Sequence, residues 1–151
     1  MSDAQSTEQS RGASALGRCL CTGVRFEVCG PLRPIVYCHC TLCRRASGHF
    51  AAATACAPEK LRLISAESLR WYPSSEGAQR GFCGTCGSQL FWKPAHGRHI
   101  SIWAGALDSP TGLGSATHIF LADKGDYYEI TDGLPQWPQW PQPTQSSSPR
   151  R

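Results

Sequence analysis

The spacing of the cysteines constrains this chain more than any other feature. Seven of its nine cysteines fall into three tight groups, which are Cys19-x-Cys21, Cys38-x-Cys40-x-x-Cys43 and Cys83-x-x-Cys86. Cysteines this close in sequence present two or three sulfurs to one metal ion at about 2.3 Å. An odd number of cysteines cannot all pair within the chain, and a reducing compartment disfavours disulfides. The spacing therefore predicts metal sites.

Zinc is the metal that these groups favour. In the segment Phe82-Cys83-Gly84-Thr85-Cys86-Gly87 the glycines relieve the steric limits of a tight turn, where backbone N–H groups can point toward sulfur. Iron–sulfur clusters also use cysteine, but the chain lacks the C-x-x-C-x-x-C run of bacterial ferredoxins. We therefore expect zinc, with two ions per chain.

The seven clustered cysteines divide into four and three. The two pairs can form a closed four-cysteine site that joins an early segment to a later one and contributes folding free energy. The triplet would then hold a second zinc with a fourth position open for water or substrate. Spacing alone leaves another grouping open, in which a C-x-C and a C-x-x-C from different groups share an ion. Cys29 and Cys56 are interpreted as small apolar residues.

An open zinc bound by three thiolates suits thiol chemistry better than hydrolysis. The thiolates donate negative charge to the ion, so its bound water should be a poor source of hydroxide. A sulfur-rich ion instead matches another thiol entering the fourth position near a carbonyl group. This favours the formation or cleavage of a carbon–sulfur bond. Cys38, Cys40 and Cys43 are thus the predicted catalytic zinc ligands.

Three side chains near the triplet are candidates for substrate binding. Arg44 and Arg45 directly follow Cys43, and either can pair with a substrate carboxylate through two parallel hydrogen bonds. The alternative for both is an ordinary surface position. His49 is a candidate fourth ligand, acid–base group or turn residue.

The rest of the chain predicts a mostly-β domain. Its 151 residues suit one domain, and its 15 glycines and 11 prolines argue against long helices. Short apolar or alternating runs predict strands. These runs are 24–28, 35–38, 50–57, 61–64, 69–72, 89–92, 100–104 and 118–122. One helical turn is expected around 42–46, so the class is all-β, or β with one or two helical turns.

The two ends of the sequence differ in composition from the body, which is expected to span 16–135. Residues 1–15 are rich in Ser, Gln and Ala, and residues 136–151 are rich in Pro, Gln, Ser and Trp, so both predict tails. Trp137 and Trp140 stand three apart among prolines, which places them on one face of a polyproline helix. Three interpretations of these tryptophans stay open: they fold back on the body, they contact a neighbouring molecule, or they do neither.

Charge and hydropathy bear on where the protein is located and on which kinds of molecule it binds. The sequence has neither a secretory signal nor an apolar run long enough to span a membrane, so a cytoplasmic location is expected. The net charge of +4 fits either an ordinary solvated surface or a mildly basic body suited to an anionic small molecule or to nucleic acid. The chain lacks a dense Lys/Arg run, which argues against nucleic acid.

Three stretches of the chain resemble the glutathione-dependent formaldehyde-activating enzyme family, which shares its domain with centromere protein V. They are 17–26 (GRCLCTGVRF), 38–45 (CHCTLCRR) and 81–91 (GFCGTCGSQLF). Tyr37 and the segments 69–72 and 132–135 also look like family positions, so the likeness covers residues 16–135.

The resemblance implies an Mss4-like, zinc-stabilised antiparallel β fold and condensation of glutathione with formaldehyde, which is carbon–sulfur lyase chemistry. The implied ligands are Cys19, Cys21, Cys83 and Cys86 for a structural zinc and Cys38, Cys40 and Cys43 for a catalytic one. Thr22 departs from the pattern because glycine is expected there most often. Residues 48–50 fall in a region that differs among members, which leaves the aldehyde and the thiol open.

A second hypothesis belongs to another class. The chain would be a zinc-stabilised binding module for nucleic acid or protein, with both metals structural and no catalysis. Thiol-dependent loss of an aldehyde would favour the enzyme, whereas salt-sensitive binding to DNA or RNA would favour the module.

Overall fold

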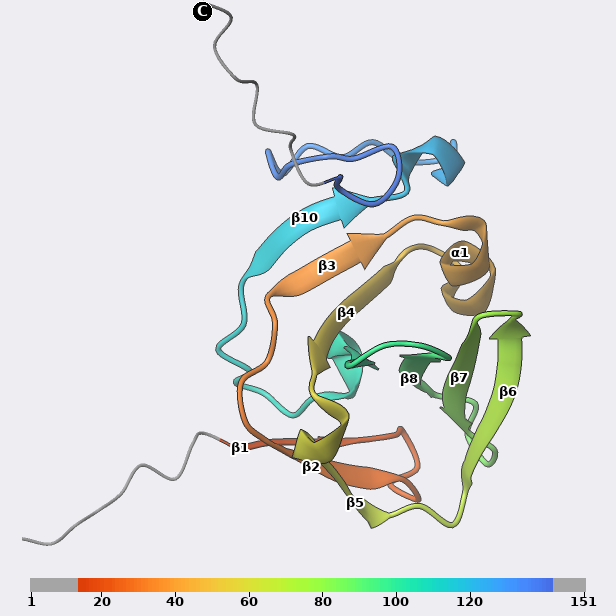
Figure 1. Cartoon of the computed structure of the whole chain (residues 1–151), viewed down its shortest axis with the longest axis vertical. Coiled ribbons are helices and arrows are strands. Elements are labelled where there is room, and N and C mark those ends of the chain that lie inside the picture. Colours follow the sequence, from red (N-terminus) through yellow and green to blue (C-terminus); the bar gives the residue numbers. More distant parts are fainter. Residues whose placement is uncertain (1–13, 143–151) are drawn as a thin grey trace, which may run out of the picture.

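The computed structural model describes residues 14–142, which form two β-sheets and a short α-helix (Figure 1). The strands are β1 (Ser14–Arg18), β2 (Arg25–Cys29), β3 (Ile35–Cys38), β4 (Ala51–Cys56), β5 (Leu61–Ser65), β6 (Leu69–Ser75), β7 (Ala78–Cys83), β8 (Gln89–Pro94), β9 (Ile100–Trp103) and β10 (Ser115–Ile119). The α-helix is α1 (Thr41–Ser47), and the 3-10 turns are η1 (Pro58–Lys60), η2 (Ala104–Ala106) and η3 (Leu121–Asp123). The predicted mostly-β class with one short helix is confirmed.

The strands divide into a small sheet and a large one. The small sheet has the order β1-β2-β5 and is antiparallel. The large sheet has the order β10-β3-β4-β9-β8-β7-β6, and within it β10 pairs with β3 in parallel while the other pairs are antiparallel. The large sheet bends so that β3 and β4 lie on one side of the molecule and β6 and β7 on the other (Figure 1).

The hydrophobic core joins the two sheets. β2 alternates exposed and buried positions, as a half-buried strand does, and places Phe26 and Val28 inside. Phe26 meets Phe91 of β8 edge-on, with ring centroids 5.0 Å apart, and Ile102 of β9 is also fully buried. Edge-to-face contact is a favourable geometry for aromatic rings, so this pair ties the small sheet to the large one.

The helix α1 begins and ends with recognisable caps. Cys40 is the N-cap residue, and its sulfur accepts a hydrogen bond from the Cys43 N–H. Gly48 ends the helix at a φ of +81°, a left-handed conformation that glycine adopts without steric cost. The predicted helical turn at 42–46 is therefore confirmed, and its cap is itself one of the predicted metal ligands.

Three features depart from the predicted elements. β1 begins at Ser14, inside the expected N-terminal tail, and β7 has no predicted counterpart. The predicted strand at 118–122 is wrong in its second half, because Phe120 turns the chain with a φ of +58° and η3 follows. The expected boundaries at 15/16 and 135/136 stay predictions, and residues 1–13 and 143–151 lie outside the described part.

The start of the expected C-terminal tail is ordered against the body. His118 of β10 exchanges backbone hydrogen bonds with both neighbours of Gln136: its N–H donates to the Pro135 carbonyl at 2.9 Å, and its carbonyl accepts from the Trp137 N–H at 3.0 Å. The Leu121 N–H donates in turn to the Trp137 carbonyl at 3.0 Å. This segment therefore runs beside β10, the edge strand of the large sheet (Figure 1).

Candidate metal centre

The two cysteine pairs meet in a closed cluster. Cys19 and Cys21 lie in the turn after β1, and Cys83 and Cys86 lie at the end of β7 and in the turn after it. The four sulfurs lie within 4.8 Å of one another, and the Cys19–Cys21 and Cys21–Cys83 sulfur separations are both 3.6 Å. Four sulfurs held tetrahedrally at about 2.3 Å from an ion would stand about 3.8 Å apart. The donor set and its spacing fit zinc.

Three of the four sulfurs in the closed cluster have hydrogen-bond partners outside the cluster that favour thiolates. The Val24 N–H donates to the Cys19 sulfur at 3.2 Å, and the Ser68 hydroxyl lies 3.3 Å from the Cys83 sulfur. The Ser88 hydroxyl lies 3.2 Å from the Cys86 sulfur and lowers the pKa of Cys86 to about 5. Metal binding requires deprotonated cysteine, so these contacts prepare the ligands.

The remaining three clustered cysteines form a second, smaller cluster. Cys38 ends β3, Cys40 caps α1, and Cys43 lies in the first turn of the helix. Their sulfurs also lie within 4.8 Å of one another, and no His, Asp or Glu in residues 14–142 joins them. Hydrogen bonds from the Cys38 and Cys43 thiols lower the pKa of Cys40 to about 2. The cluster therefore offers three sulfur ligands and leaves a tetrahedral ion one position short.

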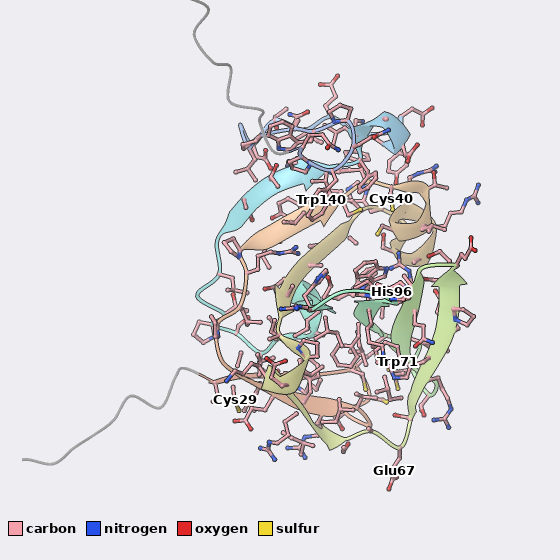
Figure 2. The ribbon with its side chains drawn as sticks, in the orientation of Figure 1. Cys29, Cys40, Glu67, Trp71, His96 and Trp140 are labelled. Carbon is pink, nitrogen blue, oxygen red and sulfur yellow. The ribbon has the colours of Figure 1, made fainter. Side chains whose placement is uncertain are left out.

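A cavity of about 410 Å³ opens beside the three cysteines. Aromatic and small apolar side chains form most of its wall. They are Trp92, Trp103, Trp140, Phe120, Val36, Leu42, Ala51, Ala53 and Ile119. Figure 2 shows Trp140 and Cys40 close together at one end of the molecule. Phe120 reaches the cavity from a left-handed backbone conformation, which bulky residues adopt only where the surrounding structure enforces it.

Two arginines supply the charge in this cavity. Arg80 of β7 is 3% exposed, and its Nη2 donates to the Cys43 sulfur at 3.4 Å. Arg33 donates through Nη2 to the Ala53 carbonyl at 3.3 Å, while its buried Nε has no hydrogen-bond partner among the described residues. Burial lowers the pKa of Arg33. None of the described side chains that line the cavity is acidic.

A chain of hydrogen bonds fixes the residue between Cys38 and Cys40. His39 is 1% exposed, its Nδ1 contacts the Tyr128 hydroxyl, and its Nε2 lies 2.8 Å from His118 Nδ1. His118 Nε2 donates to Asp132 at 2.8 Å. Burial, with a smaller effect from the charge of His118, lowers the pKa of His39 to about 4, so its ring is neutral at pH 7. The contacts allow one direction of donation, in which the Tyr128 hydroxyl donates to His39 Nδ1 and His39 Nε2 donates to His118 Nδ1. This network holds the backbone that carries Cys38 and Cys40.

The predicted substrate-binding residues lie outside the cavity lining. Arg44 and Arg45 are on α1, and Arg45 is exposed. His49 follows the helix, packs against Phe50 in a tilted arrangement with ring centroids 4.3 Å apart, and contacts the Tyr127 hydroxyl at 3.4 Å. None of the three lines the cavity. A contact with substrate at the outer end of the site stays a prediction for them.

Apart from the three cysteines, the residues that line the cavity were missed by sequence reasoning because they come from distant parts of the chain. Arg80 looks like an ordinary exposed arginine of a strand, and Trp140 belongs to a Pro-rich segment. One usable signal was the run Ala51-Ala52-Ala53, since small side chains on a central strand leave space. A second, more open depression of about 720 Å³ includes Cys19 but none of the three-cysteine cluster. We therefore place the candidate site in the smaller cavity.

Comparison with known proteins identifies the family of the chain. The family model described as glutathione-dependent formaldehyde-activating enzyme matches residues 14–123. An uncharacterised lyase of Schizosaccharomyces pombe is 25% identical over 119 residues, which cover 77% of this chain and 85% of that protein. A putative glutathione-dependent formaldehyde-activating enzyme of Halomonas elongata is 29% identical over 124 residues, covering 76% and 79%.

A solved structure supports the same fold. The crystal structure of a Rhodobacter sphaeroides protein aligns with a TM-score of 0.52 at 23% identity, covering 81% of this chain and 98% of that one. Within residues 14–142, no helix is long and apolar enough to cross a membrane. The match to the family model spans most of the chain and contains all seven clustered cysteines. The chain belongs to the glutathione-dependent formaldehyde-activating enzyme family.

Proposed function

We propose that this protein is an enzyme of the carbon–sulfur lyase type that joins or cleaves a small thiol and an aldehyde. The main support for this proposal is the contrast between the two clusters. Four sulfurs complete one site, whereas the three sulfurs of the other face a cavity. We assign zinc to both clusters, as structural and catalytic ions respectively. A purely structural role for both ions would leave the cavity beside the three cysteines without a purpose.

In keeping with the name of the matching family, glutathione is the proposed thiol and formaldehyde is the smallest aldehyde that the site would accept. When bound, zinc in the three-cysteine cluster would supply a position that holds a substrate thiol as thiolate. In the joining reaction the thiol sulfur forms a bond to the carbonyl carbon. The electron pair of the C=O π bond moves to oxygen, which receives the proton lost by the thiol. Cleavage is the reverse of these steps.

The residues of the chain have separate tasks in this scheme. Arg80 places a positive charge against the cysteine sulfurs, which offsets the negative charge that they gather. The His39 network holds Cys38 and Cys40 in position. Arg44 and Arg45 on α1 are proposed to attract the carboxylates of glutathione outside the cavity, with His49 nearby.

Calorimetry of the zinc-loaded full chain tests this function. Glutathione should bind with release of a proton, which is counted in buffers of different ionisation enthalpy, and S-methylglutathione should bind at least about tenfold more weakly. Arg44→Ala should weaken glutathione binding more than Arg62→Ala, because Arg62 already pairs with Glu27 in the small sheet. Equal binding of the free and the methylated thiol would mean that the sulfur does not reach the metal, and the proposal would be withdrawn.

A further inference from the structure

The cavity beside the three cysteines is larger than formaldehyde needs. Its volume of about 410 Å³ lies in the usual range for small-molecule pockets. A water molecule takes about 30 Å³ of liquid volume, so an aldehyde with two heavy atoms would occupy only a small part. The remaining space is walled mainly by apolar side chains, which hold water poorly. Its volume and lining suit a larger substrate.

The lining does not suit the body of glutathione. That tripeptide carries an ammonium group and two peptide groups, and burying these without partners costs free energy. The described lining offers no acidic side chain to pair with the ammonium. It offers instead three tryptophans, and Ala51 and Ala53 on β4 leave room for a flat group between the walls. Such walls select a planar apolar body.

The two arginines add a requirement for negative charge. Neither Arg33 nor Arg80 forms an ion pair with a carboxylate within residues 14–142. A guanidinium carries five N–H donors, and the observed contacts use one donor of each side chain. The buried Nε of Arg33 in particular has no partner among the described residues. Buried donors of this kind are normally satisfied, so Arg33 offers a donor that a ligand acceptor would fill.

We propose that the cavity binds the carbonyl partner of the reaction, and that this partner is an aldehyde with a flat, apolar body and a carboxylate group. The inference rests on the proposed function, in which a thiol adds to an aldehyde at the three-cysteine cluster. The carboxylate pairs with Arg33 and with the spare donors of Arg80, and the body lies against Trp92, Trp103 and Trp140. The addition has the same balance as before: a C–S bond forms, the C=O π bond breaks, and the thiol proton ends on oxygen.

Trp140 makes this site depend on the C-terminal segment. The segment before it is hydrogen-bonded through its backbone to β10. Trp140 lines the cavity and is 52% exposed, so it covers the cavity from the solvent side. Trp137 belongs to the same segment and does not line the cavity. The pair therefore provides a matched comparison, in which only one tryptophan should affect binding.

Binding of para-hydroxymethylbenzoate, an unreactive analogue of the aldehyde, tests the inference by calorimetry on the zinc-loaded full chain. Its neutral methyl ester should bind about tenfold more weakly, and Arg33→Gln should weaken the benzoate by a similar factor. Trp140→Ala should weaken both compounds about threefold to tenfold. Two controls, Trp137→Ala and the exposed Arg25→Gln on β2, should stay within about twofold of the unmodified protein.

The outcomes separate this inference from the proposed function. Equal affinity for the benzoate and its ester, or unchanged binding in Trp140→Ala, would overturn the aromatic acid as occupant. Trp140→Ala keeps the test valid if Arg33→Gln does not fold, because Trp140 is largely exposed. Glutathione and S-methylglutathione are titrated in the same preparations without any aldehyde. Their equal binding would remove the proposed function, whereas their difference with no benzoate binding would remove the inference alone.

Discussion

Loss of a cysteine from the closed cluster should destabilise the protein more than loss of one from the open cluster. The closed cluster links Cys21 to Cys83, which are 62 positions apart, whereas Cys38 and Cys43 are only five apart. If a metal link constrains the unfolded chain as a disulfide does, the chain-entropy estimate is about 4 kcal/mol for the long link and about 2 kcal/mol for the short one. We therefore expect Cys83→Ser to cost about 2 kcal/mol more than Cys40→Ser.

Urea denaturation in reducing, zinc-containing buffer measures this difference. For a domain of this size, 1 kcal/mol corresponds to about 2–4 °C in melting temperature, so the two variants should also melt several degrees apart. Cys56→Ser is the control, because Cys56 is 5% exposed and belongs to neither cluster. Its loss of stability gives the cost of replacing a buried thiol by a hydroxyl, and is subtracted from both.

The difference between the two variants tests the assignment of the two clusters. If Cys40→Ser and Cys83→Ser lose equal stability after correction, the open cluster stabilises the fold as much as the closed one does. The assignment of a structural and a catalytic site would then be wrong. Zinc content of each folded variant, measured by atomic absorption, shows whether the intended ion was lost.

Three further predictions follow from single features. Protein purified under reducing conditions should contain two zinc ions per chain, and a single ion, or iron with visible colour, would contradict the division into four and three. Thr22→Gly should raise the free energy of unfolding, measured by urea denaturation, by at most about 1 kcal/mol, because Thr22 has a φ of +66°, a conformation that glycine adopts without steric cost. Replacement of the exposed turn residue Glu76 by glycine should instead lower the free energy of unfolding. Asp132→Asn should lower the free energy of unfolding above pH 5, since the hydrogen bond from His118 holds the pKa of Asp132 below its ordinary 3.8. This stabilisation is lost as the pH falls through the lowered pKa, so the difference from the unmodified protein should narrow below about pH 4. A difference that stays constant there would mean that the Asp132 carboxylate is not its source.

The two or three cysteines within each sequence group could be predicted to lie together because each group is local. One turn determines where Cys83 and Cys86 point, and the cap of α1 determines Cys40 and Cys43. Which groups share a cluster was left open by spacing, because Cys21 and Cys83 are 62 positions apart. Strands with clean alternation, such as β2, were predicted for the same reason. Thr22 also stood out correctly as a departure, since its positive φ is a conformation that glycine adopts freely.

The cavity could not be predicted because its lining depends on tertiary packing. β7 reads Ala78-Gln-Arg-Gly-Phe-Cys83, a pattern without regular alternation, since Arg80 is buried in the cavity and Gly81 lies under the Trp71 ring. An added Cβ at Gly81 would stand 3.0 Å from that ring. Nothing local in the sequence indicates that Arg80 meets Cys43, which is 37 residues away.

β7 connects the two clusters, which makes a last prediction possible. Cys83 at the end of this strand belongs to the closed cluster, and Arg80, three residues earlier, donates to the Cys43 sulfur of the open one. An ion in the closed cluster should therefore hold Arg80 in the position that favours thiolates in the other.

Because the coupling of two binding equilibria is reciprocal, each ion should raise the affinity for the other by the same factor. Chelator competition measures it: the open cluster should bind zinc more tightly in the unmodified protein than in folded Cys86→Ser, and Arg80→Gln should reduce the difference. If Cys86→Ser binds its single zinc with the affinity of the unmodified open cluster, β7 does not transmit the effect. Arg80 would then act on Cys43 independently of the closed site.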